Sequence, residues 1–195
     1  MTGLEFVRLS KHVRHDIGQR HRFAHTLGVA RLARRLARRH GADAQRALLA
    51  GMLHDLARLY APERLLSECE ARNMRIDAFE RAHPTVLHAR LGAELAREQF
   101  GVTDDAVLAA IRKHTLGSAT MSTLDTIVYL ADGLEPGRRF EERAALERLA
   151  LRNLDAAMRA TLRSTVDYNK AHGRQIAPAT AAAIEFFATK EKQTA

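Results

Sequence analysis

The sequence predicts an all-α fold built as a single helical domain. Apolar residues recur at helical spacing along most of the 195 residues, and helix-favouring Ala, Leu and Arg dominate the composition. Neither strand-like alternation nor an internal repeat is present in the sequence. A hydrophobic fraction of 46% over this length suffices for one substantial core, and nothing in the chain requires a second domain.

The composition limits the functions that the chain can have. A formal net charge of +8 favours an anionic partner such as a nucleotide, a nucleic acid or a membrane surface. Much of this charge is arginine scattered along 31–39, where it equally suits a solvated helix face, and aromatic residues are few, so nucleic-acid binding is not expected.

The single Cys69 excludes an intrachain disulfide. The N-terminus does not resemble a signal peptide and no apolar run is long enough to span a membrane, so we expect a cytoplasmic protein.

Helical periodicity and boundary signals place the elements in order. The expected helices span 4–17, 22–40, 43–60, 63–73, 84–100, 103–114, 122–132, 141–152, 154–170 and a last one from 178. The first has a partly apolar face that includes Leu4, Val7, Val13 and Ile17. Gly41 ends the second helix.

Proline, glycine and capping residues mark the later boundaries. Pro84 opens a helix that Gly101 closes. Ser122 and Asp125 form a predicted capping box at the start of a helix that Asp132 terminates.

The same signals predict the domain organisation. We expect an N-terminal helix in 1–19 packed on the main domain of residues 20–190, and a frayed tail at 191–195. Within the main domain, 73–84 looks irregular.

The dipeptide His54-Asp55 lies in an apolar stretch with few polar interruptions, the helix predicted at 43–60, which we expect to be largely buried. Burying a carboxylate costs several kcal/mol unless a hydrogen-bonded cation or a metal ion compensates it. Taken alone, however, such a pair is more often a hydrogen-bonded core pair than a metal site. Evidence for a metal site therefore has to come from other residues of the chain.

Further histidines and an aspartate lie beside apolar stripes or at helix ends. Together with the dipeptide they make a candidate ligand set of His25, His54, Asp55, His88, His114 and Asp132. Imidazole and carboxylate ligands suit Fe, Mn, Zn, Ni or Co, and a carboxylate can bridge two ions. We expect Asp55 to bridge, with His88 and His114 on the second ion. Two such ions activate a shared water and neutralise phosphoryl charge, which is the chemistry of phosphate-ester or phosphoanhydride hydrolysis.

Each candidate also has an alternative interpretation. His25 and His88 could bond to helix carbonyls, His114 could interact with a helix C-terminus, and Asp132 could pair with Arg138. His83 rivals His88 but directly precedes Pro84. The remaining histidines are expected at the surface, namely His12, His15, His21, His40 and His172.

The order of the six residues resembles the HD-domain phosphohydrolase superfamily. Local strings narrow the resemblance to the YqeK-type symmetrical diadenosine tetraphosphate hydrolases of bacteria, over about residues 20–180. These strings are RFAHTLGVA (22–30), AGMLHD (50–55), LHARLGA (87–93), AIRKHTLG (110–117) and LADGLEPGR (130–138).

This resemblance implies a helical HD domain with a binuclear centre, typically of iron, that cleaves diadenosine tetraphosphate into two ADP by attack of a metal-bound hydroxide. It makes all six residues metal ligands and gives catalytic roles to His54, Asp55 and Arg58. It places the substrate against Arg22, His25, Asp55, His88, His114, Thr115 and Arg138. A homodimer is also compatible with it.

Two positions depart from the family pattern, and one carboxylate has a supporting role. Arg58 stands where relatives commonly have Lys, and Gly133 replaces a larger residue. Glu135 is expected to orient an imidazole or Arg138. Another HD nucleotide phosphohydrolase, or a weakly active nucleotide sensor, is the alternative function. The Gly-Tyr-Pro motif usual for cyclic-dinucleotide hydrolysis is absent from the sequence.

Overall fold

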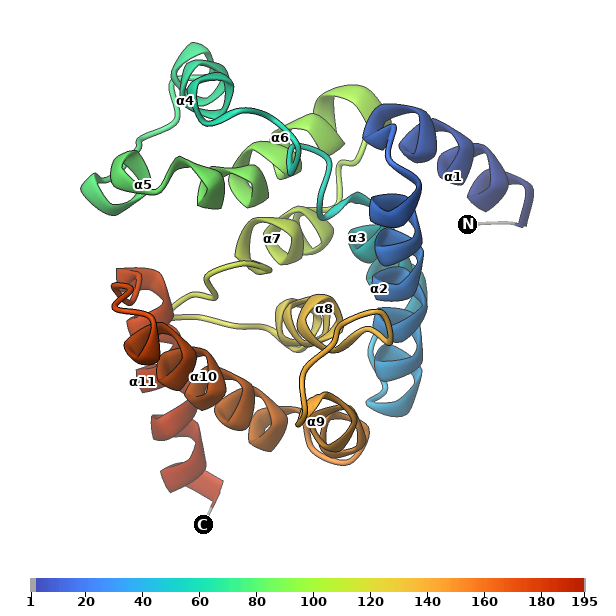
Figure 1. Ribbon diagram of the computed structural model, residues 1–195. Coiled ribbons are helices and arrows are strands. Elements are labelled where there is room, and N and C mark those ends of the chain that lie inside the picture. The colour runs from blue at the N-terminus through green and yellow to red at the C-terminus, as the bar shows by residue number, and fades with distance from the viewer. Residues whose placement is uncertain (1–2, 195) are drawn as a thin grey trace.

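The fold is all-α, which confirms the prediction (Figure 1). The structure, a computed structural model, describes residues 3–194, and within that range it contains no strand. Its helices are α1 (Gly3–Ile17), α2 (Arg20–Arg39), α3 (Ala44–Leu53), α4 (Pro62–Ala71), α5 (Ala78–Ala82), the 3-10 helix η1 (Pro84–Leu87), α6 (His88–Phe100), α7 (Asp105–Lys113), α8 (Thr123–Leu134), α9 (Arg143–Ala150), α10 (Leu154–Ala171) and α11 (Pro178–Thr194). None of the helices in this range is both long and apolar enough to cross a lipid bilayer.

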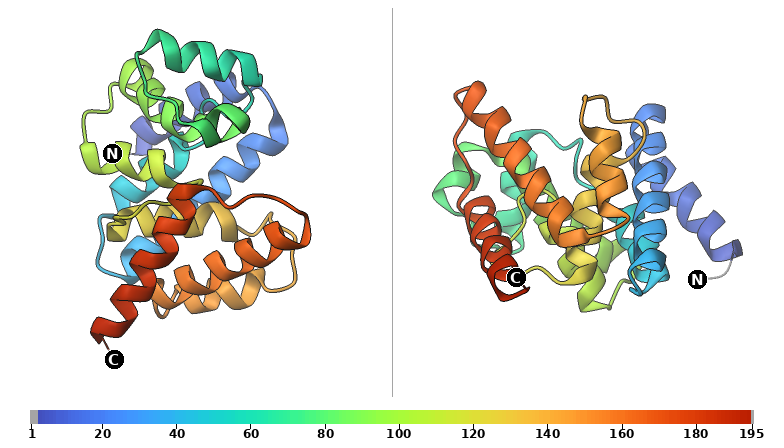
Figure 2. Two further views of the ribbon diagram at one scale, coloured as in Figure 1. Left: turned by 90° about the vertical axis from the view of Figure 1, so that its left-hand side faces the viewer. Right: turned by 90° about the horizontal axis from the view of Figure 1, so that it is seen from below.

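Four helices, α2, α3, α7 and α8, pack against one another at the centre of the molecule. Helices α4 to α6 lie on one side of them and α9 to α11 on the other (Figure 2). α2 and α3 approach closely, because a Cβ on Gly51 would lie only 2.7 Å from Ala30 Cα. The fully buried Leu53, Ile111 and Leu130 belong to the core that these helices share. This core fixes the helix ends that carry the candidate site residues.

α1 packs on α2 and α3. Val13 and Ile17 are buried there, whereas Leu4 and Val7 are 63% and 48% exposed. The expected apolar face is therefore wrong at Leu4 and Val7, although Phe6 and Leu9 of the same half pack against the core. The separation of residues 1–19 from the main domain stays a prediction.

The His-Asp pair does not lie inside a helix, as the sequence had suggested. α3 ends at Leu53, and His54 begins a series of tight turns. In these turns the N–H of Arg58 donates to the carbonyl of Asp55, three residues earlier, at 3.0 Å. The i to i−4 ladder has therefore stopped, and His54 and Asp55 follow a helix end instead of sharing a helix face.

The stretch at 73–84, expected to be irregular, contains α5. Its start is fixed by a capping box between Asp77 and Glu80. Pro84 opens the 3-10 helix η1, so α6 begins only at His88.

Two later boundaries also follow local hydrogen bonds. The predicted capping box of Ser122 and Asp125 is confirmed at the start of α8. α8 continues past Asp132 to Leu134, because an aspartate in the last turn does not by itself stop a helix. α11 extends to Thr194, and Ala195 lies outside the described residues.

Candidate metal centre

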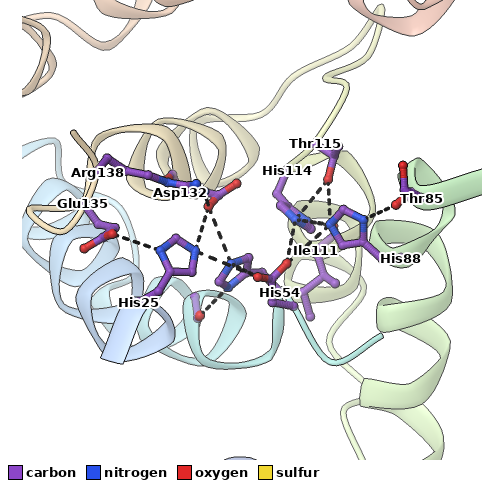
Figure 3. Close-up of polar contacts among 12 residues, drawn as sticks. His25, His54, Thr85, His88, Ile111, His114, Thr115, Asp132, Glu135 and Arg138 are labelled. Carbon is purple, nitrogen blue, oxygen red and sulfur yellow. Dashed lines mark hydrogen bonds and ion pairs between the residues drawn. The ribbon is translucent and has the colours of Figure 1, made fainter. Parts of the chain in front are cut away.

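Three of the candidate histidines are held in the same way, each by the backbone carbonyl three residues earlier (Figure 3). The Nδ1 to oxygen distances are 2.8 Å from His54 to Gly51, 2.5 Å from His88 to Thr85, and 2.7 Å from His114 to Ile111. A carbonyl oxygen only accepts hydrogen bonds, so Nδ1 carries the proton and the neutral ring presents the lone pair of Nε2. His54 and His114 follow the last residues of α3 and α7, where helix carbonyls lack intrahelical partners.

His25, in α2, is held by a carboxylate instead. Its Nδ1–H donates to Glu135 Oε1 at 3.0 Å (Figure 3). The other oxygen of Glu135 accepts the N–H of Gly137 at 2.7 Å. A Cβ on Gly28 would lie 2.5 Å from Glu135 Oε2, so a glycine at this position leaves room for the carboxylate. Glu135 therefore orients an imidazole, one of the two roles that the sequence suggested for it.

Asp55 lies between two groups of ligand atoms. Its Oδ2 is 3.6 Å from His54 Nε2 and 3.9 Å from His25 Nε2. Its Oδ1 is 3.4 Å from His88 Nε2 and 3.8 Å from His114 Nε2. One carboxylate thus faces both groups, as a bridging ligand would.

Asp132, in α8, completes one of the two groups. Its Oδ1 is 3.0 Å from His25 Nε2 and 3.8 Å from His54 Nε2. We call His25, His54 and Asp132 the carboxylate half, and His88 and His114 the imidazole half. The halves adjoin, because ligand atoms of His54, His114 and Asp132 also lie within 4.8 Å of one another. The structure therefore brings all six predicted ligands together, although it does not test their roles.

The atoms facing the centre fit metal ions. In the imidazole half the two Nε2 atoms are 3.2 Å apart, and both carry lone pairs when Nδ1 is protonated. Such lone pairs repel each other unless a proton or a cation intervenes, and two nitrogens about 2.1 Å from one ion are compatible with this separation. In the carboxylate half, Nε2 of His25 and of His54 are buried and lack a hydrogen bond from any described residue. Imidazoles with carboxylates suit divalent first-row metals.

Burial keeps the imidazole half neutral. It lowers the pKa of His114 to about 3, with the neighbouring His54 and His88 acting in the same direction. Burial also lowers the pKa of His88, against the pull of the Asp55 carboxylate. Neither ring holds a second proton at neutral pH, so both can bind a metal without first releasing one.

The carboxylate half has the opposite electrostatics. Burial lowers the pKa of His25, but the carboxylates of Asp132 and Glu135 outweigh it, so the pKa lies above the ordinary 6.5. Burial raises the pKa of Asp132 and of Asp55, yet the surrounding histidines outweigh it in both, and both carboxyls have a lowered pKa. The half therefore holds negative charge together with a histidine that binds protons readily.

One predicted substrate contact, Thr115, and one predicted catalytic residue, Arg58, lie at the imidazole half. Thr115 Oγ1 is 3.2 Å from His88 Nε2 and 3.1 Å from His114 Nε2. Arg58 is half-buried, and its charge opposes protonation of His88. Both side chains can therefore meet a group bound beside this half.

Two further predicted substrate contacts, Arg22 and Arg138, belong to α2 and to the turn after α8. Arg22 lies one helical turn before His25, and its buried Nε has no hydrogen-bond partner among residues 3–194. Arg138 donates from Nη2 to Asp132 Oδ1 at 2.6 Å and from Nε to the Asp132 carbonyl at 3.0 Å. The ion pair considered as an alternative for Asp132 is thus present, and Arg138 holds a candidate ligand.

Several supporting groups were missed by the sequence interpretation. The carbonyls that hold His54, His88 and His114 belong to the backbone, so no side chain in the sequence marks them. The available signal is that each histidine lies at a helix end, three residues after a carbonyl that its ring can reach. The roles of Gly28 and Gly51 depend on what another helix places opposite them. His40, expected at the surface, is half-buried because its Nε2 bonds to the carbonyl of Ala150 at 2.7 Å. The exposed histidines include His12, His15, His21, His83 and His172.

Comparisons with known proteins agree with this geometry. Residues 22–137 match the HD domain family. A symmetrical bis(5'-nucleosyl)-tetraphosphatase of Bacillus subtilis is 33% identical over 82% of this chain and 86% of its own length. One from Halalkalibacterium halodurans is 34% identical over 88% and 91%.

A solved structure extends the similarity to three dimensions. It is a predicted HD superfamily hydrolase from Clostridium acetobutylicum described as involved in NAD metabolism, 29% identical, with a TM-score of 0.91 over 95% of this chain and 97% of that one. The match spans the helices on both sides of the candidate centre. The chain belongs to the HD domain family of metal-dependent phosphohydrolases, in the group that includes the symmetrical bis(5'-nucleosyl)-tetraphosphatases.

Proposed function

We propose that this chain hydrolyses diadenosine tetraphosphate symmetrically into two molecules of ADP. The names of its relatives from Bacillus and Halalkalibacterium support the substrate class. The single observation that carries the proposal is the position of Asp55, whose two oxygens face two groups of histidines across one buried centre. A shared carboxylate between two ligand groups is the arrangement expected of a binuclear phosphohydrolase.

The six candidate ligands hold the cofactor in this proposal. When bound, two divalent ions would supply an activated water and neutralise charge on the phosphoryl oxygens. Iron is the first candidate because the family resemblance implies it, while Mn, Zn, Ni and Co suit the same ligands. The reaction requires no cysteine nucleophile, and Cys69 is buried with a pKa that burial raises.

Cationic side chains position the polyphosphate. The unpartnered Nε of Arg22 is available to a phosphate oxygen beside the carboxylate half. Arg138 contributes charge there while keeping Asp132 deprotonated and in place. Arg58 and the Thr115 hydroxyl act at the other half. Together these groups bind an extended anion along the centre and stabilise charge that develops at phosphorus.

The decisive experiment is turnover of diadenosine tetraphosphate under anaerobic conditions by protein of measured metal content, with the products separated by chromatography. We expect ADP as the only nucleotide product, whereas asymmetric cleavage would give ATP and AMP. A cyclic dinucleotide, run in parallel, should remain intact.

Two variants connect the activity to the site. His54→Ala should abolish turnover while nucleotide affinity persists, because the arginines remain. His15→Ala removes an exposed histidine of α1 and should behave as wild type. Metal-loaded wild-type protein that binds diadenosine tetraphosphate without hydrolysing it would instead support the nucleotide sensor.

A second candidate substrate comes from the structural relative described as involved in NAD metabolism. NAD is also an adenine dinucleotide joined through phosphates, so the same centre could act on its pyrophosphate. Turnover of NAD, measured beside diadenosine tetraphosphate, ranks the two. Faster hydrolysis of NAD would reassign the chain to another HD nucleotide phosphohydrolase.

Two further expectations accompany this proposal. A homodimer is compatible with the family resemblance, and light scattering after size exclusion would test it. A cytoplasmic location stays a prediction, which fractionation of cells expressing the protein would check.

A further inference from the structure

A cavity of about 630 Å³ lies directly beside the imidazole half. Thr115 lines it, and the Thr115 hydroxyl is 3.2 Å from His88 Nε2. Thr85, whose carbonyl holds the His88 ring, also lines it. A ligand with its phosphate at the centre could therefore extend past Thr115 into this cavity.

The two walls of the cavity come from distant parts of the sequence. One wall is α5 with η1, and the other is the end of α10 with the segment that leads into α11. These elements face each other at the left of Figure 1, and Figure 2 shows the same side from the front. The volume falls within the roughly 300–1,000 Å³ typical of small-molecule sites.

The lining suits an anionic ligand with a flat aromatic group. None of the described lining side chains is acidic, and Arg174 adds a positive charge. Phe79 and His83 both line the cavity and form a tilted ring pair, with centroids 4.5 Å apart. Nucleobases stack on rings of this kind, and stacking requires no particular base.

An amide supplies the selectivity that stacking lacks. Asn169 lines the opposite wall, half-buried, and its side chain has no hydrogen-bond partner among residues 3–194. An asparagine amide offers a donor and an acceptor side by side, which matches the N6 and N7 edge of adenine. Guanine presents two acceptors at the corresponding positions and matches less well.

We propose that this cavity is a nucleoside pocket that binds one adenosine of the substrate, with the base against Phe79 and His83 and its edge read by Asn169. This inference rests on the proposed function, because it gives the cavity to one end of a dinucleoside polyphosphate. It also assigns a role to His83, which the metal centre does not use. The phosphates of the same nucleotide then run past Thr115 to the imidazole half.

Calorimetric titration of metal-loaded protein tests the pocket without any turnover. The probes are ADP, GDP and inorganic pyrophosphate, which lacks a nucleoside. Phe79→Leu keeps apolar volume but removes the ring, and we expect it to weaken ADP binding about tenfold. Pyrophosphate binding and metal content should not change. Equal ADP affinity in wild type and Phe79→Leu, or an equal loss for pyrophosphate, would overturn the proposal.

The chain offers a matched control for this variant. Phe100 pairs with His12 in nearly the same geometry, with centroids 4.6 Å apart, but it does not line the cavity. Phe100→Leu should bind ADP as wild type does. If Phe79→Leu lowers the melting temperature, His83→Ala provides the second test, because its exposed ring can be removed without opening the core. It too should weaken ADP binding, and unchanged affinity would count against the pocket.

Base selectivity forms the second arm. Wild type should prefer ADP to GDP, and Asn169→Ala should remove most of that preference while both nucleotides still bind more tightly than pyrophosphate. An unchanged preference would contradict the role of Asn169. Turnover separates this inference from the proposed function. If Phe79→Leu loses ADP affinity but the wild type does not hydrolyse diadenosine tetraphosphate, the pocket is retained and the hydrolase is rejected. If the wild type hydrolyses it but Phe79→Leu binds ADP as wild type does, the hydrolase is retained and the pocket is rejected.

Discussion

The two halves of the centre hold similar ligands by different means. In the carboxylate half, Glu135 orients His25 and Arg138 fixes Asp132, so charged side chains position the ligands. In the imidazole half, backbone carbonyls orient His88 and His114, and Asp55 is the acidic residue within ion-pair distance of them in the described chain.

This difference has an electrostatic consequence. The carboxylate half attracts a cation strongly, and protons compete with a metal there because the pKa of His25 is raised. The imidazole half is already neutral, and backbone carbonyls already orient its two rings. The distance between the rings, however, depends on how the two helix ends that carry them pack together. Asp55 borders both halves, so a substitution there should weaken metal binding in both. Substitutions elsewhere should weaken metal binding in one half at a time.

Asp55→Asn should have the largest effect, because it removes the negative charge that both halves share. We expect kcat to fall at least about a thousandfold and the protein to lose metal from both halves. Metal analysis beside turnover checks this. His15→Ala serves as the control, and an Asp55→Asn protein that kept two ions would show that Asp55 does not bridge.

Glu135→Gln should weaken the carboxylate half alone. The amide keeps the size of the side chain but removes the charge that favours binding through His25, and such substitutions typically cost about 10- to 100-fold in metal affinity. Chelator competition should therefore resolve one weakened ion and one unchanged ion. Equal loss of both ions would mean that the halves are not separable.

Acidification should act on the halves in sequence. The pKa of His25 is raised, so this ring gains a proton first as the pH falls, and each unit below that pKa should cost the carboxylate half about tenfold in apparent affinity. The pKa values of His88 and His114 are lowered, so the imidazole half should keep its ion to lower pH. Titrations of metal binding between neutral and acidic pH test the order, which simultaneous release would refute.

Thr115→Val should have the smallest effect. The substitution preserves shape but removes the hydroxyl beside His88 and His114, so we expect KM for diadenosine tetraphosphate to rise about three- to tenfold with metal content unchanged. Thr115→Ser retains the hydroxyl and should restore most of the affinity. A large loss of metal in the valine variant would show that Thr115 supports the ligands instead of the substrate.

The agreement between sequence and structure is uneven for physical reasons. Helices with long apolar stripes, such as α2 and α6, lie close to where periodicity predicted them. The end of α3 was missed because apolar residues continue to Leu56 and Ala57 in turns that bury them as effectively as a helix would. The whole of α5 was missed because a five-residue helix carries too little periodicity to detect.

The sequence by itself determined the all-α class, the family resemblance and the set of six candidate ligands, because helical periodicity and side-chain chemistry are both written locally in the chain. The tertiary structure decided which oxygen of Asp55 faces which histidines, that Glu135 holds His25, and that α5 faces α10 across a cavity. His25 and Glu135 are 110 residues apart. Contacts over such separations depend on how several helices pack together, and no local pattern records that packing.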